Sequence, residues 1–211
     1  MTSSSIQLLG FSLAFTGFVG LIASTAMTEW KASSYAGENI VTAQATYEGL
    51  WMSCVSQSTG HIQCKAFDSL LQQPTELQVT RALMISSILL SGTAALVAML
   101  GMKCTTCLAE NKQQKARVAL AGGIVFILAG LCALVATSWY GKNITTRFYQ
   151  QFGTSDVRFE FGKALFIAWG AATLSVLGGG FLCCKCSGAS SRQYTQNPKS
   201  CASARPGVDY V

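Results

Sequence analysis

Four long stretches without a charged residue constrain this chain more than any other feature. They cover about Leu8–Thr28, Ala82–Met102, Val118–Trp139 and Ala164–Cys184. Each is about 21–22 residues long, and roughly 20 apolar residues cross the hydrocarbon core of a bilayer as a helix. A helix in a soluble core would show a polar face, whereas these stretches show none. The sequence therefore predicts four transmembrane helices.

The first stretch also invites comparison with a signal peptide, because the small residues Ala23-Ser24-Thr25-Ala26 are similar to a cleavage site. However, Met1–Ser5 contains no Lys or Arg, and the apolar run is longer than that of an ordinary signal peptide. We interpret it as an uncleaved signal-anchor helix.

The segments between the stretches carry unequal charge. Residues 29–81 contain three basic and five acidic residues, whereas residues 103–117 contain four basic residues and one acidic residue. Residues 140–163 contain four basic and two acidic residues, and residues 185–211 contain four and one. Because short loops rich in Lys and Arg stay in the cytosol, we expect residues 1–7, 103–117 and 185–211 to be cytosolic and the other two segments to be extracellular. The net charge of +6 follows from this topology and does not indicate nucleic-acid binding.

The first extracellular segment contains a polar, hairpin-like stretch between two cysteines. Ser58-Thr59-Gly60 suits a three-residue hairpin loop with the glycine in the left-handed conformation. In that register Cys54 lies opposite Cys64, close enough for a disulfide, and oxidation is permitted outside the cell. Closing so short a loop contributes about 2–3 kcal/mol. Since a small sheet has little core of its own, we expect a sheet stapled by this disulfide.

A helical pattern follows the hairpin. Phe67, Leu70 and Leu71 recur at helical spacing before Pro74. This spacing predicts a short amphipathic helix near the membrane surface. Its apolar stripe either contacts a neighbouring subunit or packs on the sheet.

The second extracellular segment combines aromatic residues with a glycosylation sequon. Its aromatic residues include Phe148, Tyr149, Phe152, Phe159 and Phe161. Such rings serve as interfacial anchors or as contacts between molecules. The sequon Asn143-Ile144-Thr145 makes Asn143 a glycosylation candidate, although its closeness to the third stretch disfavours efficient glycan transfer.

Five cysteines crowd the cytosolic edge of the predicted membrane. They are Cys104, Cys107, Cys183, Cys184 and Cys186. A zinc site would need four ligands held together, and nothing in the sequence brings these thiols together. Juxtamembrane cysteines are typical sites of S-palmitoylation. We therefore expect at least one of them to be palmitoylated and expect no metal site.

No group of residues predicts catalysis. His61 is the only histidine, and its place at the hairpin loop predicts an exposed, inert side chain. Transporters carry charged or histidine residues inside their spans, whereas the four stretches contain no Asp, Glu, Lys, Arg or His. We expect neither an enzyme nor a cofactor.

Several residues in fixed order resemble the signature of the claudin family. They are Trp30, Gly49-Leu50-Trp51, Cys54, Cys64 and Arg81. Further matches are Phe148-Tyr149, Phe159-Glu160-Phe161-Gly162 and the terminal Asp209-Tyr210-Val211. The resemblance thus covers nearly the whole chain. Within the family, Ser34-Tyr35-Ala36-Gly37 is similar to the barrier-forming group.

The resemblance implies a membrane α+β protein. Its fold would be a left-handed four-helix transmembrane bundle with a small extracellular antiparallel sheet of about five strands, four from the first extracellular segment and one from the second. The resemblance also implies a plasma-membrane protein that polymerises with same-family proteins in cis and in trans and seals the paracellular space at tight junctions. The alternative is a non-junctional accessory protein of the wider peripheral-myelin-protein superfamily.

The residue after the second cysteine bears on ion selectivity. Cation-conducting members of the family carry an acid at the position of Lys65. A fixed ammonium group beside a narrow path repels cations and tolerates anions. We therefore expect a cation-excluding barrier or a weakly anion-favouring path, with Lys31 adding to the field and Glu48 opposing it. A solvated surface lysine without this role is the alternative.

The resemblance also implies contact sites between molecules. Phe148, Tyr149, Phe159 and Glu160 match positions that the family uses for adhesion or lateral assembly. Many claudins carry prolines after the Phe-Tyr pair, whereas Gln150-Gln151-Phe152-Gly153 follows here. We therefore expect a differently shaped loop.

The C-terminal residues Asp209, Tyr210 and Val211 present a free carboxylate and an apolar last side chain. PDZ grooves bind such ends by strand addition. We expect junctional PDZ scaffold proteins as partners, reached through a disordered tail rich in polar residues.

Overall fold

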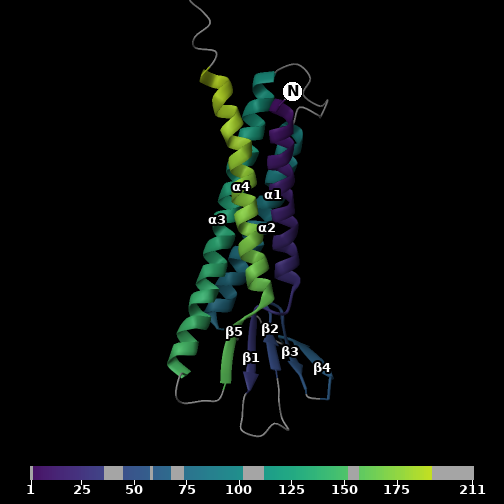
Figure 1. Ribbon diagram of the computed structural model, residues 1–211, viewed down its shortest axis with the longest axis vertical. Coiled ribbons are helices and arrows are strands. Elements are labelled where there is room, and N and C mark those ends of the chain that lie inside the picture. Colours follow the sequence, from purple (N-terminus) through teal and green to yellow (C-terminus); the bar gives the residue numbers. More distant parts are fainter. Residues whose placement is uncertain are drawn as a thin grey trace, which may run out of the picture.

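The computed structural model describes residues 2–35, 45–57, 59–67, 74–101, 112–151 and 157–191. Four helices run side by side, and a five-stranded sheet lies beyond one end of them (Figure 1). Some of the predicted sites lie outside the described residues: Leu70, Leu71, Cys104, Cys107, Asp209, Tyr210 and Val211.

The helices are α1 (Thr2–Ala26), α2 (Thr75–Gly101), α3 (Lys112–Gln151) and α4 (Lys163–Ser191). Each contains a segment that is long and apolar enough to cross a membrane. This confirms the prediction of a four-span bundle. It follows from the charge-free stretches, because a lipid-exposed backbone must satisfy its own hydrogen bonds.

Helix α3 is longer than the charge-free stretch that predicts it. Its 40 residues span about 60 Å, twice the roughly 30 Å thickness of a bilayer core. The stretch ends at Trp139, but the helix continues because Tyr140 and Ile144, one turn apart, are buried in the same cluster as Trp30. Part of the second predicted extracellular segment is therefore helical, and Figure 1 shows this end of α3 running beside the sheet.

Small residues let the helices approach closely. At the contact between α1 and α4, Gly17 and Gly178 leave no room for a side chain, and Gly123 and Gly130 do the same between α3 and α4. Lipid tails are as apolar as leucine, so close packing rather than hydrophobic burial drives association within a membrane. The fully buried Ala168 of α4 contributes to the same packing.

The sheet is antiparallel throughout, in the order β4-β3-β2-β1-β5. Its strands are β1 (Lys31–Tyr35), β2 (Ala45–Glu48), β3 (Met52–Ser56), β4 (Ile62–Ala66) and β5 (Val157–Phe161). Four strands come from the first connecting segment and one from the second, as the resemblance implies. Strand β4 forms one free edge, and all five of its side chains are exposed.

The hairpin between β3 and β4 has the predicted register. Cys54 lies opposite Cys64, and the two form a disulfide. The Gln57 N–H donates to the His61 carbonyl oxygen at 3.0 Å, and Gly60 has a φ of 81°. The left-handed turn needs this glycine, since other residues rarely adopt a positive φ.

The sheet is tied to the bundle where β5 enters α4. The Gly162 N–H donates to the Trp30 carbonyl oxygen at 3.1 Å, and the Ala164 N–H donates to the Glu29 carbonyl oxygen at 3.0 Å. A Cβ atom on Gly162 would overlap the Glu29 carbonyl group. Only a glycine allows the two backbones to come this close.

We expect Gly162→Ala to lower the free energy of unfolding by about 3 kcal/mol, because the added methyl group forces two hydrogen-bonded backbones apart. The matched control is Gly170→Ala on α4, where a Cβ would meet nothing within 4 Å. That change should leave stability unchanged or raise it by up to about 1 kcal/mol. Thermal unfolding of the purified protein in detergent, followed by tryptophan fluorescence, measures both. Equal melting temperatures for the two variants would contradict the close approach.

Candidate functional site

Trp30 fastens the first strand to the first helix. Its side chain is completely buried, and its Nε1–H donates to the Ser24 carbonyl oxygen at 2.8 Å. Its ring meets Tyr140 edge-on, with the ring centroids 5.5 Å apart. Ser24 is in the last turn of α1, where carbonyl groups have no partner within the helix. Trp30 therefore acts as a side-chain cap for α1.

Trp51 caps the next carbonyl group in the same way. Its Nε1–H donates to the Thr25 carbonyl oxygen at 3.1 Å. The Arg81 guanidinium carbon lies 5.4 Å from the centroid of the Trp51 ring and 5.4 Å from that of the Phe67 ring. The Arg81 Nε–H donates to the Leu50 carbonyl oxygen at 2.5 Å. Arg81 is only 5% exposed. Its planar group thus clamps the hairpin onto α2 through stacking and a directed hydrogen bond.

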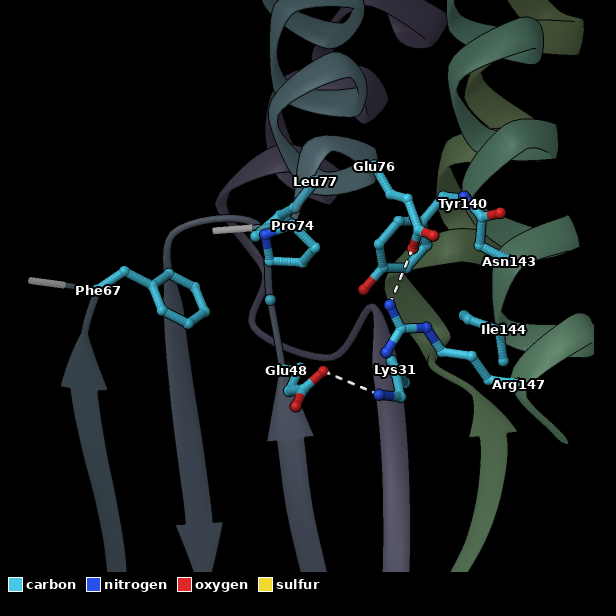
Figure 2. A pocket seen from close by; sticks show the side chains of 11 residues that line it. Lys31, Glu48, Phe67, Pro74, Glu76, Leu77, Tyr140, Asn143, Ile144 and Arg147 are labelled. Carbon is cyan, nitrogen blue, oxygen red and sulfur yellow. Dashed lines mark hydrogen bonds and ion pairs between the residues drawn. The ribbon is translucent and has the colours of Figure 1, made fainter. Parts of the chain in front are cut away.

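A cavity of about 200 Å³ with both polar and apolar walls lies where the sheet meets α2 and α3. We refer to it as the junction cavity. Two ion pairs line it: Lys31 Nζ is 3.0 Å from Glu48 Oε2, and Arg147 Nη2 is 3.3 Å from Glu76 Oε2. Figure 2 shows one pair on the sheet and the other between the helices, with the Tyr140 hydroxyl group pointing into the space between them.

Sequence reasoning missed the junction cavity. The residues Tyr140, Ile144 and Arg147 lie at positions i, i+4 and i+7 of one helix, so a helical period extended beyond Trp139 was the available signal. Nothing local could have paired Arg147 with Glu76, which is 71 positions away.

Lys65 lies on the exposed edge strand β4, and its side chain is exposed. The register places four residues in one row across β4, β3, β2 and β1. In that order they are Lys65, Ser53, Glu48 and Lys31. Directly opposed residues share a face of the sheet. Lys65 and the Lys31–Glu48 pair therefore lie on one face, and Lys65 is about 10 Å from Glu48 at a strand spacing of about 4.8 Å.

Glu48 compensates the charge of Lys31. The Lys31 side chain is 12% exposed, whereas that of Glu48 is 43% exposed. Lys31 therefore lines the junction cavity as the more buried member of an ion pair, whereas Lys65 lies at the exposed outer edge of the same face of the sheet.

The other predicted contact residues are distributed over three elements. Phe67 follows β4 and packs against Arg81. Phe148 and Tyr149 lie near the end of α3 with their rings 5.9 Å apart, and Tyr149 is 71% exposed. Phe159 and Glu160 lie on the edge strand β5, with the Glu160 side chain exposed.

Two cysteines near the end of α4 differ in exposure. Cys184 is exposed, whereas Cys183 is partly buried with its Sγ 3.8 Å from the Leu120 carbonyl oxygen. Cys186 lies in the last turns of α4. No cluster of three or more metal-ligating side chains occurs among residues 2–35, 45–57, 59–67, 74–101, 112–151 and 157–191.

Comparison with known proteins agrees with this geometry. The sequence model of the PMP-22/EMP/MP20/Claudin family matches residues 4–182. Claudin-7 of Mus musculus is 53% identical over 211 residues, which cover all of both chains. This chain belongs to the claudin family.

Other claudins are similar to the same extent. Claudin-1 of Rattus norvegicus is 52% identical over 211 residues and all of both chains. Claudin-19 of Homo sapiens is 54% identical over 186 residues, which cover 88% of this chain and 83% of the relative. Claudin membership supports a multi-pass plasma-membrane protein with a tight-junction role and oligomerisation with other claudins. It points to a structural junction protein rather than an enzyme.

We expect Trp30→Phe to lower the free energy of unfolding by about 2–3 kcal/mol, because the indole N–H is lost and the Ser24 carbonyl group is left buried without that partner. The control is Trp139→Phe on α3, whose side chain is half exposed. Melting temperatures in detergent measure both changes. A Trp30 variant as stable as the control would show that the cap contributes little.

We expect Asn143 to carry no glycan. Its Nδ2 atom, where a glycan would attach, is buried, and Asn143 lies within α3. Expression in mammalian cells followed by peptide-N-glycosidase digestion should leave the electrophoretic mobility unchanged, as should Asn143→Gln. A digestion-sensitive band that Asn143→Gln abolishes would contradict this prediction.

Proposed function

We propose that this claudin polymerises with itself and with other claudins into tight-junction strands and forms a cation-excluding barrier or a weakly anion-favouring path. Lys65 supplies the selecting charge. The observation that carries this proposal is the position of Lys65 on an exposed edge strand of a sheet that stands beyond the end of the bundle.

The charges on the Lys65 face support this selectivity. Lys31 and Glu48 compensate each other at 3.0 Å, so Glu48 opposes the field of Lys65 less than an unpaired carboxylate would. Lys65 and Glu48 are about one Debye length apart at physiological ionic strength. An ion in a path along β4 is therefore governed more by Lys65 than by the pair.

The orientation proposed for the chain puts both termini in the cytosol and the sheet outside the cell. The disulfide between Cys54 and Cys64 supports it, because disulfides persist in oxidising surroundings. The start of α1 and the end of α4 lie at the end of the bundle away from the sheet (Figure 1). The basic loop 103–117 agrees with the positive-inside rule.

Several exposed residues suit contacts between copies. Tyr149 of α3 and Glu160 and Phe161 of β5 are exposed on the side of the sheet opposite to β4. We assign them, with Phe148 and Phe159, to lateral or trans assembly, and we retain Phe67, Leu70 and Leu71 for the same role. Since aromatic residues dominate many interfaces, the β5 edge is the favoured assembly surface.

Two cytosolic features complete the proposal. The Asp209-Tyr210-Val211 end docks PDZ scaffold proteins of the junction. Palmitoylation of the juxtamembrane cysteines strengthens membrane anchoring, and the exposed Cys184 is the most accessible of those whose side chains the structure describes.

We expect Lys65→Asp, expressed in a claudin-poor epithelial monolayer, to raise the sodium-to-chloride permeability ratio about fivefold relative to the unaltered chain. Reversing one charge beside an ion path changes the ion energy by on the order of 1 kcal/mol. Dilution potentials and transepithelial resistance measure this effect. The control is Lys142→Asp, an equal charge change at an exposed position on α3, outside the sheet.

Unchanged resistance and permeability ratio in both variants, despite delivery to cell contacts, would contradict the barrier. Freeze-fracture of fibroblasts that express the chain separates the remaining explanations. Strands are expected from a polymerising claudin, whereas a non-junctional accessory protein would form none.

A further inference from the structure

We propose that the junction cavity binds the zwitterionic headgroup of a membrane phospholipid, the phosphocholine type in particular. The ammonium group would lie against the carboxylates of Glu48 and Glu76, and the phosphate group against Lys31 and Arg147. This binding involves neither Lys65 nor ion selectivity, so it stands apart from the function proposed above.

The junction cavity lies at the depth of lipid headgroups. Its walls include Leu77 of α2 and Asn143 of α3, whereas the charge-free stretches begin at Ala82 and end at Trp139. At 1.5 Å per residue, Leu77 and Asn143 are about 6–8 Å outside the hydrocarbon core. The headgroup layer is roughly 5–8 Å thick on each side of a bilayer. A headgroup therefore reaches this cavity without leaving its layer.

The charges of the junction cavity suit a ligand that is neutral overall but carries both signs. Two cationic and two anionic side chains line it. A simple cation would be attracted by the two carboxylates but repelled by the two basic side chains, and the reverse holds for a simple anion. The two ion pairs engage the Oε2 atoms of Glu48 and Glu76, so each carboxylate offers its second oxygen to an ammonium group. The Arg147 pair engages Nη2, and the guanidinium group has further donors for a phosphate oxygen.

The apolar walls and the size of the junction cavity agree with this ligand. Phe67 and Tyr140 line it, and aromatic faces combined with carboxylates bind quaternary ammonium groups. Its volume of about 200 Å³ is smaller than the roughly 300–1,000 Å³ of clefts that enclose drug-sized ligands. A headgroup whose acyl chains stay in the bilayer is of suitable size.

The junction cavity is also open to the outside. The side chains of Glu76, Glu48 and Arg147 are between 39% and 49% exposed, whereas that of Lys31 is 12% exposed. Figure 2 shows Arg147 and Glu76 on the helices facing Lys31 and Glu48 on the sheet. A headgroup can therefore enter past the helix pair and reach Lys31 at the inner wall.

The test uses the full-length chain in nanodiscs with equal amounts of phosphatidylcholine and phosphatidylglycerol of identical acyl chains. Native mass spectrometry after release counts the lipid adducts of each kind. We expect phosphatidylcholine adducts to predominate. The double variant Glu76→Gln/Arg147→Gln keeps the net charge but removes one group of each sign, and it should lower the ratio of phosphatidylcholine to phosphatidylglycerol adducts about tenfold.

Two further variants separate binding from folding. Lys142→Gln changes an exposed charge on α3 outside the cavity and should leave the adduct ratio unchanged. Tyr140→Phe keeps the ring that packs on Trp30 and removes only the hydroxyl group, which points into the space between the two ion pairs (Figure 2) and can donate to a phosphate oxygen. It should therefore lower the ratio in a chain with an unchanged melting temperature. Equal amounts of both adducts in the unaltered chain, or an unchanged ratio in a folded double variant, would overturn the proposal.

Glycerophosphocholine, the same headgroup without acyl chains, distinguishes the source of the ligand. Added to the nanodiscs, it should displace phosphatidylcholine adducts only in large excess, because the lipid is held at the membrane at a high effective concentration. Displacement at equal concentration would identify a soluble phosphocholine compound as the ligand and overturn the assignment to a lipid.

Discussion

Two indole N–H groups complete the end of α1, and the position of the sheet depends on them. The last carbonyl groups of a helix have no partner within it, and at a membrane boundary such groups are expensive to leave unpaired. The Ser24 and Thr25 carbonyl oxygens accept from Trp30 and Trp51. Because the two tryptophans come from opposite ends of the β1–β2 hairpin, capping the helix also fixes the sheet on the bundle. The two signature tryptophans, Trp30 and Trp51, are thus explained as caps of α1.

The sequence predicts those parts of the molecule whose physical cause is local. Runs without charge predict the spans, and the loop glycine Gly60 with two cysteines predicts the hairpin register. Contacts between distant residues escaped this reasoning. The resemblance identified Arg81, but nothing near it in sequence indicates that it stacks between Trp51 and Phe67.

The sequence did not predict the full length of α3, and the reason is different. Lys142 and Arg147 interrupt its apolar pattern, so hydrophobicity alone ends the span at Trp139. The helix continues because every third or fourth residue on one side packs against the sheet and the start of α2, while Lys142 lies exposed on another side. Amphipathic continuation of a span is visible only once its partner surface is known.

The two lysines on this face of the sheet differ in how far they are exposed to water. Near the bundle, where water is partly excluded, Lys31 and Glu48 compensate each other, which limits the penalty of burying either charge. At the outer edge, Lys65 is exposed, where water screens its charge. Burial and charge compensation thus go together where the sheet meets the bundle.

The continuous helix α3 has a mechanical consequence. One rigid rod of 40 residues crosses the membrane and then flanks the sheet, with no hinge between the two parts in the described residues 112–151. Helices adapt to bilayer thickness by tilting. When such a helix tilts in the lipid, the part beyond the membrane tilts by the same angle. The thickness of the bilayer is thereby transmitted to the angle between the sheet and the membrane plane.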